Sequence, residues 1–166
     1  MKDYLKSNSS RQIAVLLLFL GACYLVAWVG AQVSPGLGST EWYDSIQKPS
    51  WNPPSWVFGP VWSLLYTLMG IAAWLVWKEV GFKNAKIAMV LFFTQLILNG
   101  LWSHIFFGMQ QIGWALVEII ILLIAIVATT IAFFRKRSLA GWLMAPYILW
   151  VAFATFLTYT IWTLNV

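Results

Sequence analysis

The side chains best suited to bind or transfer something are one carboxyl group and two amides inside long apolar stretches. Glu118 is the only formally charged residue between Lys86 and Arg135. A charge near the middle of a membrane costs on the order of 3 kcal/mol, which favours a ligand or proton role, with a hydrogen bond to a neighbouring helix as the alternative. Gln95 and Asn99 are four residues apart and share one face of a helix. These two amides either line a ligand pocket or serve only to form hydrogen bonds between helices.

Aromatic residues also fall on shared helical faces. These faces join Trp62 with Tyr66, Trp114 with Glu118, and Tyr147 with Trp150 and Ala154. Aromatic rings with a few polar groups are typical of a pocket for a flat, largely apolar ligand. The sequence shows no metal-binding cluster, Ser/His/Asp arrangement or phosphate-binding glycine loop, so we expect no metal site and derive no catalytic centre from the residues.

The composition indicates that membrane-spanning helices position these side chains. Hydrophobic residues make up 61% of the 166 residues and charged residues 9%, against roughly 25% charged in a soluble domain. Charge-free blocks cover 12–40, 49–77 and 138–166, and each is long enough for a span of about 20 residues. The block 87–134 would measure about 72 Å as one helix, so it must cross twice, with its break at 107–113.

We therefore predict an all-α integral membrane protein with one transmembrane domain over residues 1–166. Its five helices are expected at about 11–32, 57–78, 84–106, 112–134 and 139–163. Open strands are excluded because lipid offers their backbone groups no partners, and a barrel because the apolar runs do not alternate with polar positions. The first helix also resembles a signal peptide. Its apolar stretch is longer than that of a typical signal peptide, which favours its retention as a membrane helix in the mature protein.

Basic residues are distributed unevenly between the two ends of these helices. One side carries nine of them: Lys2, Lys6, Arg11, Lys78, Lys83, Lys86, Arg135, Lys136 and Arg137. The other side carries only Lys48. The positive-inside rule then predicts a cytoplasmic N-terminus and an external C-terminus. Topology and anionic membrane lipid account for the basic residues, so we expect no nucleic-acid partner.

The loop at 33–56 is the only one long enough to have its own structure. Residues 41–56 include three tryptophans and three prolines, and prolines restrict the backbone to a preformed path. Two interpretations are open: an aromatic anchor at the membrane interface, or a structured lid over the helix bundle.

Counted from the end that carries this loop, unusual residues of four helices reach similar depths. Trp62, Tyr66, Asn99, Glu118 and Ala154 lie about 7–15 Å deep, with Gln95 and Trp150 somewhat deeper. We therefore predict a pocket for a flat, apolar ligand in the outer half of the bundle, beneath the loop. If the ligand carries acidic groups, Lys48 is the basic residue at this end with which they could pair.

At these positions the chain resembles the tryptophan-rich sensory protein / translocator protein family, whose animal members are the peripheral-type benzodiazepine receptors. The resemblance covers about residues 33–163. It begins with Trp-Tyr-Asp-Ser-Ile-Gln-Lys-Pro-Ser-Trp-Asn-Pro-Pro at 42–54 and continues at 59–66, 95–99, 106–108, 113–118 and 146–154.

The resemblance implies a five-helix bundle in a bacterial cell membrane, commonly a homodimer, with no required cofactor. It also implies a pocket for porphyrins such as protoporphyrin IX, for haem, and for isoquinoline-carboxamide or benzodiazepine compounds. The residues and the resemblance together give these expected ligand-binding residues: Trp42, Tyr43, Lys48, Pro49, Trp51, Trp62, Tyr66, Gln95, Asn99, Trp114, Glu118, Tyr147, Trp150 and Ala154. The family's sterol-recognition pattern needs a basic residue after Tyr159, and none follows here, which argues against sterol binding of that kind.

Three functions stay open. The leading one is a receptor or sensor that binds porphyrins and takes part in tetrapyrrole regulation or handling. The second is an enzyme that promotes light-dependent oxidative breakdown of porphyrin, with Trp62 and Trp150 as the catalytic candidates that the resemblance implies. The third is a porphyrin or sterol transporter. The absence of an acid/base set argues against an enzyme, and the absence of an inverted repeat argues against a transporter.

Overall fold

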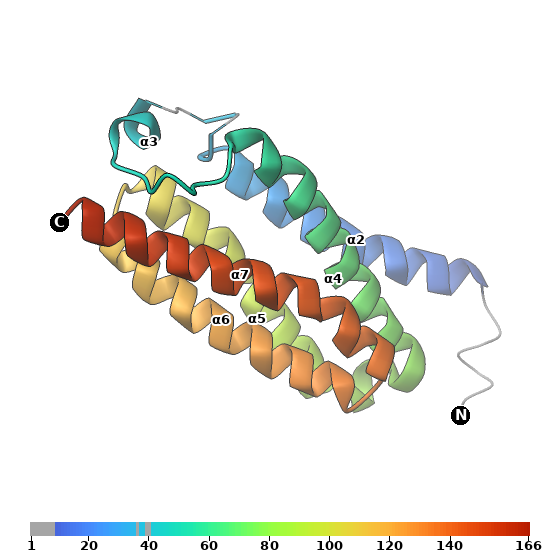
Figure 1. Ribbon diagram of the computed structural model, residues 1–166. Coiled ribbons are helices and arrows are strands. Elements are labelled where there is room, and N and C mark those ends of the chain that lie inside the picture. The colour runs from blue at the N-terminus through green and yellow to red at the C-terminus, as the bar shows by residue number, and fades with distance from the viewer. Residues whose placement is uncertain (1–8, 36, 39–40) are drawn as a thin grey trace.

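The computed structural model describes residues 9–35, 37–38 and 41–166, which form a bundle of long helices (Figure 1). In chain order the elements are α2 (Ser9–Ala31), α3 (Glu41–Ser45), α4 (Ser55–Asn84), α5 (Lys86–Ser103), the π-helix η1 (His104–Gly108), α6 (Ile112–Phe134) and α7 (Ser138–Leu164). Five helices are long and apolar enough to cross a membrane, with η1 continuing α5 in the third of them. The predicted class, an all-α membrane bundle of five helices, is confirmed.

The structure adds local features to the expected helices. α4 runs to Asn84 and not to 78, with a break at Gly81, whose φ of 71° suits glycine because it has no Cβ. The third span ends in η1, and Gln110, with a φ of 57°, lies at the turn into α6, inside the expected break at 107–113. The five-residue α3 was not expected, because so short a helix leaves no readable periodicity.

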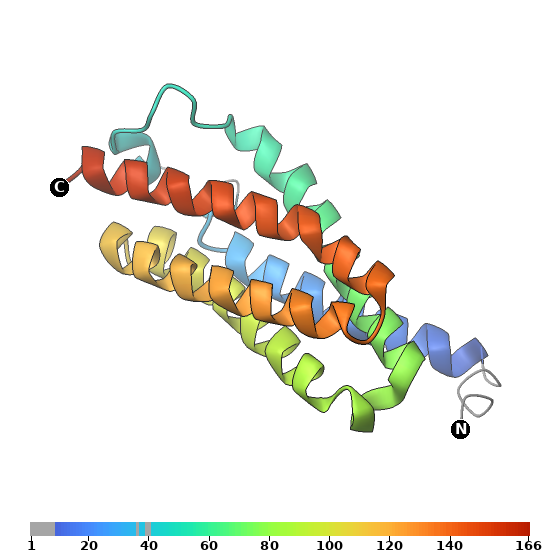
Figure 2. The same cartoon turned by 60° about the horizontal axis from the view of Figure 1, so that its bottom comes forward.

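The long helices pack side by side, and two views show which ends meet. α6 packs mainly against α7 and α5, and α2 packs mainly against α4. Figures 1 and 2 both place α3 beside the C-terminal end of α7, at the end of the bundle away from the start of α2. The fully buried core includes Phe19, Met69, Phe92, Ile126 and Met144. We refer below to the end that carries α3 as the loop end.

α2 and α4 cross closely at one glycine. A Cβ placed on Gly70 would lie 2.7 Å from Leu20 Cδ2 and 3.3 Å from Leu20 Cα, so the missing side chain lets the two helices approach. One turn nearer the loop end, the Tyr24 hydroxyl lies 2.8 Å from Thr67 Oγ1 and donates to the Ser63 carbonyl at 3.2 Å. These contacts hold the two helices together at the deep end of the candidate site.

Gly70→Ala should destabilise the protein by about 1–3 kcal/mol, because the added methyl group overlaps Leu20 in a packed interface. Gly21→Ala is the matched control, since a Cβ there meets nothing within 4 Å and alanine favours a helix. Thermal unfolding of both variants in the same nanodiscs gives the comparison. Equal melting temperatures for Gly70→Ala and wild type would show that the crossing is not close.

Candidate ligand-binding cavity

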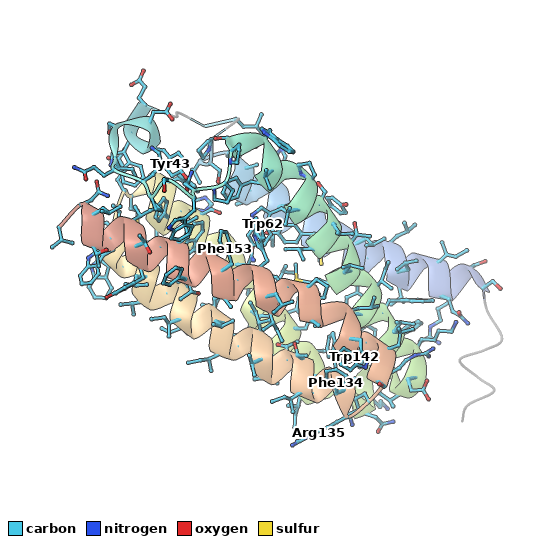
Figure 3. The ribbon with its side chains drawn as sticks, in the orientation of Figure 1. Tyr43, Trp62, Phe134, Arg135, Trp142 and Phe153 are labelled. Atoms are coloured by element: carbon cyan, nitrogen blue, oxygen red, sulfur yellow. The ribbon has the colours of Figure 1, made fainter. Side chains whose placement is uncertain are left out.

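A cavity of about 430 Å³ lies between the helices in the half of the bundle nearer the loop end. This volume lies within the range of small-molecule sites, roughly 300–1,000 Å³. Six of the expected site residues line it: Tyr43, Trp62, Tyr66, Asn99, Trp150 and Ala154. Figure 3 shows Trp62 in the space between α4 and α7, with Tyr43 nearer the loop end. Four separate elements of the chain therefore contribute expected residues to one cavity.

Aromatic rings from α4 and α7 form one wall. The Trp62 ring lies 5.5 Å from the Tyr66 ring and 6.2 Å from the Tyr147 ring, centroid to centroid. The Phe58 ring lies 5.9 Å from the Trp150 ring, nearer the loop end. Rings at these separations attract each other beyond the area they bury, so this wall is preformed.

Buried polar side chains form a network behind and beneath this wall. The Tyr66 hydroxyl donates to Asn99 Oδ1 at 2.5 Å, and Asn99 Nδ2 donates to the Tyr147 hydroxyl at 2.7 Å. The Tyr147 hydroxyl in turn donates to Gln95 Oε1 at 3.0 Å, and Gln95 Nε2 lies 3.8 Å from Met69 Sδ. Gln95 and Tyr147 lie outside the cavity lining and position Asn99 and Tyr66 within it.

Two buried side-chain groups near the cavity have no hydrogen-bond partner among the described residues. They are the carboxyl group of Glu118, which is 6% exposed, and the indole Nε1 of Trp102. Both lie eight positions from Gln110, on the antiparallel helices α5 and α6, so they lie at similar depth. Trp102 lines the cavity and Glu118 does not.

The loop forms a roof over the cavity. Tyr43 is buried, its ring lies 5.4 Å from that of Phe107, and the Trp42 ring lies 5.6 Å from that of Phe106. Burial raises the pKa of Tyr43 above its ordinary value, and the hydrogen bond to Asn52 only partly offsets this. The phenol is therefore neutral, as suits a residue packed against phenylalanine rings.

The loop is also fastened at two other points. Lys48 Nζ donates to the carbonyl oxygens of Tyr43 and Ile46, where α3 ends, and lies 4.6 Å above the Tyr43 ring. At the end of α7, the Asn165 side chain accepts from the Gln47 N–H and donates to the Gln47 carbonyl, both at 2.9 Å. The C-terminal end of the chain thereby holds the roof in place.

Several expected site residues lie outside the cavity lining. In the loop these are Trp42, Lys48, Pro49 and Trp51, and Trp51 stacks on Phe156 at 5.4 Å. Trp114 was expected on the face of Glu118, but it is 69% exposed whereas Glu118 is buried. Residues four apart on a helix are rotated by about 40°, which is enough at the edge of a buried face to turn one of them outward.

Sequence reasoning missed the contribution of the first span. α2 supplies Tyr24, Ala27, Trp28, Gly30 and Ala31 to the lining, and the segment after it supplies Ser34 and Pro35. A signal was present, because Tyr24 and Trp28 are four apart, like the pair Trp62 and Tyr66. The same spacing joins Trp102 with Phe106, which also line the cavity and stack at 4.9 Å.

The fold and the cavity define a class: small multi-pass membrane proteins whose five helices surround an aromatic cavity beneath a tryptophan- and proline-rich loop. Residues 14–163 match the model of the TspO/MBR family, and the chain belongs to this family.

Relatives from distant organisms are similar over most of their length. The translocator protein of Homo sapiens is 46% identical over 143 residues, covering 85% of this chain and 84% of that protein. The tryptophan-rich protein TspO of Chlorobaculum tepidum is 42% identical over 160 residues, covering 94% and 99%. The tryptophan-rich sensory protein of Cereibacter sphaeroides is 40% identical over 152 residues, 92% of each chain. The resemblance seen in the sequence is thereby confirmed.

Asn99→Leu should lower the stability of the protein by about 1–3 kcal/mol, because it leaves the buried Tyr66 hydroxyl without its acceptor. Glu118→Gln is the comparison, since it exchanges a buried carboxyl group that makes no hydrogen bond in the structure for an amide of nearly the same shape, and it should cost less than about 1 kcal/mol. Thermal unfolding of the two purified variants tests this. A larger loss for Glu118→Gln would mean that the carboxyl group has a partner and that the network is the weaker element.

Proposed function

We propose that this chain is a membrane receptor or sensor that binds porphyrins such as protoporphyrin IX, with a role in tetrapyrrole regulation or handling. The same cavity would accept haem and isoquinoline- or benzodiazepine-type compounds. The observation that carries the proposal is the aromatic cavity of about 430 Å³, with Trp62, Tyr66 and Trp150 in its lining. Family membership adds support, since relatives bear the names tryptophan-rich sensory protein and translocator protein.

The chemistry of the cavity suits a flat macrocycle. Its rings offer stacking partners on α4 and α7, and Trp102 offers an unpaired indole N–H. The carboxylates of a porphyrin would turn toward the loop end, where Lys48 is the basic residue. In the structure the Lys48 ammonium group is held by backbone carbonyls, so a carboxylate would have to compete with them. No cofactor is required by this proposal.

A second candidate function is light-dependent oxidative breakdown of the bound porphyrin. It is favoured by one observation: Trp62 and Trp150 both line the cavity, so two oxidisable rings would contact an excited macrocycle. The third candidate, transport, predicts movement of porphyrin across the membrane. Protein in nanodiscs or liposomes with protoporphyrin IX separates the three. Stable quenching in light and dark indicates a receptor, loss of porphyrin absorbance on illumination an enzyme, and vectorial movement across liposomes a transporter.

Trp62→Ala and Trp150→Ala should each weaken the binding of protoporphyrin IX by about 1–3 kcal/mol, the scale of a lost aromatic contact and its buried area. Binding is measured in the dark by quenching of tryptophan fluorescence in nanodiscs. Trp142→Ala is the control, because Trp142 is 65% exposed and lies far from the cavity on α7 (Figure 3). Full affinity in both cavity variants would exclude this cavity as the porphyrin site.

We further propose that the protein is a homodimer in the bacterial cell membrane, with its N-terminus in the cytoplasm and its C-terminus outside. The described basic residues support the orientation. Arg11, Lys78, Lys83, Lys86 and Arg135–Arg137 lie at the end of the bundle away from α3, and Lys48 lies at the loop end. Lys2 and Lys6, which also entered the prediction, lie outside the described residues.

Lys136→Cys should be shielded from a membrane-impermeant maleimide added to intact cells, whereas Ser50→Cys should react, because the basic end of the bundle faces the cytoplasm. Both positions are exposed, and the native Cys23 is buried and gives little background. Permeabilised cells provide the control, in which both should react. The reverse pattern in intact cells would invert the topology.

A further inference from the structure

We propose that ligands enter and leave the cavity sideways, from the bilayer, through an opening between α2 and α4. The ligand class of the site is then a flat, apolar molecule already dissolved in the membrane. This inference rests on the proposed function, because it takes the cavity as the binding site and adds the route and the source of its ligand.

The exposed part of the cavity lining identifies the opening. Five lining residues are exposed at the surface of the protein: Tyr24, Trp28, Ser55, Gly59 and Ser63. All five belong to α2 or α4, whereas none of the lining residues contributed by the loop, α5, η1, α6 or α7 is exposed. Both helices are membrane spans, so the surface at which these residues are exposed faces lipid.

The side chains along the two edges of the opening differ in size. On α4, Ser55, Gly59 and Ser63 follow each other at intervals of four, so one face of the helix carries only small residues along the opening. A Cβ placed on Gly59 would meet nothing within 4 Å. On α2, the facing lining residues are the rings of Tyr24, 44% exposed, and Trp28, 60% exposed. A flat molecule would pass between rings on one side and small residues on the other.

Described residues cover the cavity on its other sides. Toward water, Tyr43 packs against the rings of Phe106 and Phe107, and the roof is fastened by Asn165. Between α4 and α7, ring contacts join Phe58 with Trp150 and Trp62 with Tyr147. The polar network of Tyr66 and Asn99 lies at the deep end. In the described part of the chain, the side between α2 and α4 is thus the one from which a ligand would reach the cavity without displacing the roof.

The hydrogen bonds of Tyr24 mark the lower limit of the opening. Its hydroxyl joins α2 to Ser63 and Thr67 of α4, one turn from the close crossing of Leu20 and Gly70. Toward the loop end the space beside Gly59 is free. Small separations of α2 and α4 about the crossing would therefore widen the opening, and Tyr24 would resist them.

The test compares two glycines in proteins reconstituted in nanodiscs, with protoporphyrin IX in the dark as the probe. Gly59→Leu narrows the opening, so association and dissociation should both slow by about tenfold, with a smaller change in their ratio. Gly21→Leu is the matched control, because Gly21 is also exposed, lies on α2 outside the lining and has nothing within 4 Å of a Cβ. It should leave both rates within about twofold of wild type.

Tyr24→Phe is an independent variant for which we expect the opposite change in the association and dissociation rates. It keeps the ring and removes the hydrogen bonds to α4, so both rates should rise. Rates of Gly59→Leu equal to wild type, or faster dissociation with unchanged association, would overturn the lateral route while leaving the cavity as the binding site. Wild-type protein that fails to bind protoporphyrin IX would overturn the proposed function and this inference together.

Discussion

The hydrogen-bond network around Asn99 is the interaction on which the site depends. In lipid, polar side chains find no water, so Tyr66 of α4, Asn99 of α5 and Tyr147 of α7 must find one another. Because each partner comes from a different helix, the network fixes three helices at one depth. It also fixes the rings of Tyr66 and Tyr147, against which Trp62 packs. The aromatic wall of the cavity thus follows from the need to satisfy one buried amide.

The remaining boundaries of the cavity follow from how closely its helices approach. Gly70 lets α2 and α4 meet, and the Tyr24 hydroxyl extends that contact by one turn. Beyond it, small residues on α4 leave the two helices without side-chain closure. At the loop end, by contrast, aromatic contacts of Tyr43 and the paired amide of Asn165 close the roof. Close approach at one level and small residues at the next produce a cavity that is closed toward water and open toward lipid.

The sequence predicted the helices well, because the charge-free blocks and the length needed to cross a bilayer leave little choice of span. It also predicted which residues meet, where depth alone decides: Trp62, Tyr66, Asn99, Trp150 and Ala154 lie on one cavity. A spacing of four fixes rotation only to within about 40°, so Trp114 was placed on the face of Glu118 although it faces outward. The role of α2 was missed although Tyr24 and Trp28 have the same spacing as Trp62 and Tyr66, because no amide or carboxyl side chain accompanies them within residues 13–31.

Lys48 shows why the loop was the harder part to predict. From the sequence it is a cation at the loop end and so a partner for an acidic ligand. In the structure its ammonium group caps α3 through the carbonyl oxygens of Tyr43 and Ile46. A five-residue helix has few internal hydrogen bonds, so such a cap contributes much of what holds it in shape. Only the folded loop reveals this use of the residue.

The distribution of hydrogen-bonding capacity indicates how the cavity would select its ligands. Asn99 is engaged through both its oxygen and its nitrogen, and Tyr66 already donates to it. Among the described residues, the buried side-chain groups without a hydrogen-bond partner are the indole N–H of Trp102 and the carboxyl group of Glu118. A ligand would therefore gain few new hydrogen bonds from buried side chains and would be held chiefly by ring contacts and by the fit of its flat face. Selection by shape and apolar area is the mode that suits a site whose ligands arrive through lipid, where polar groups are scarce.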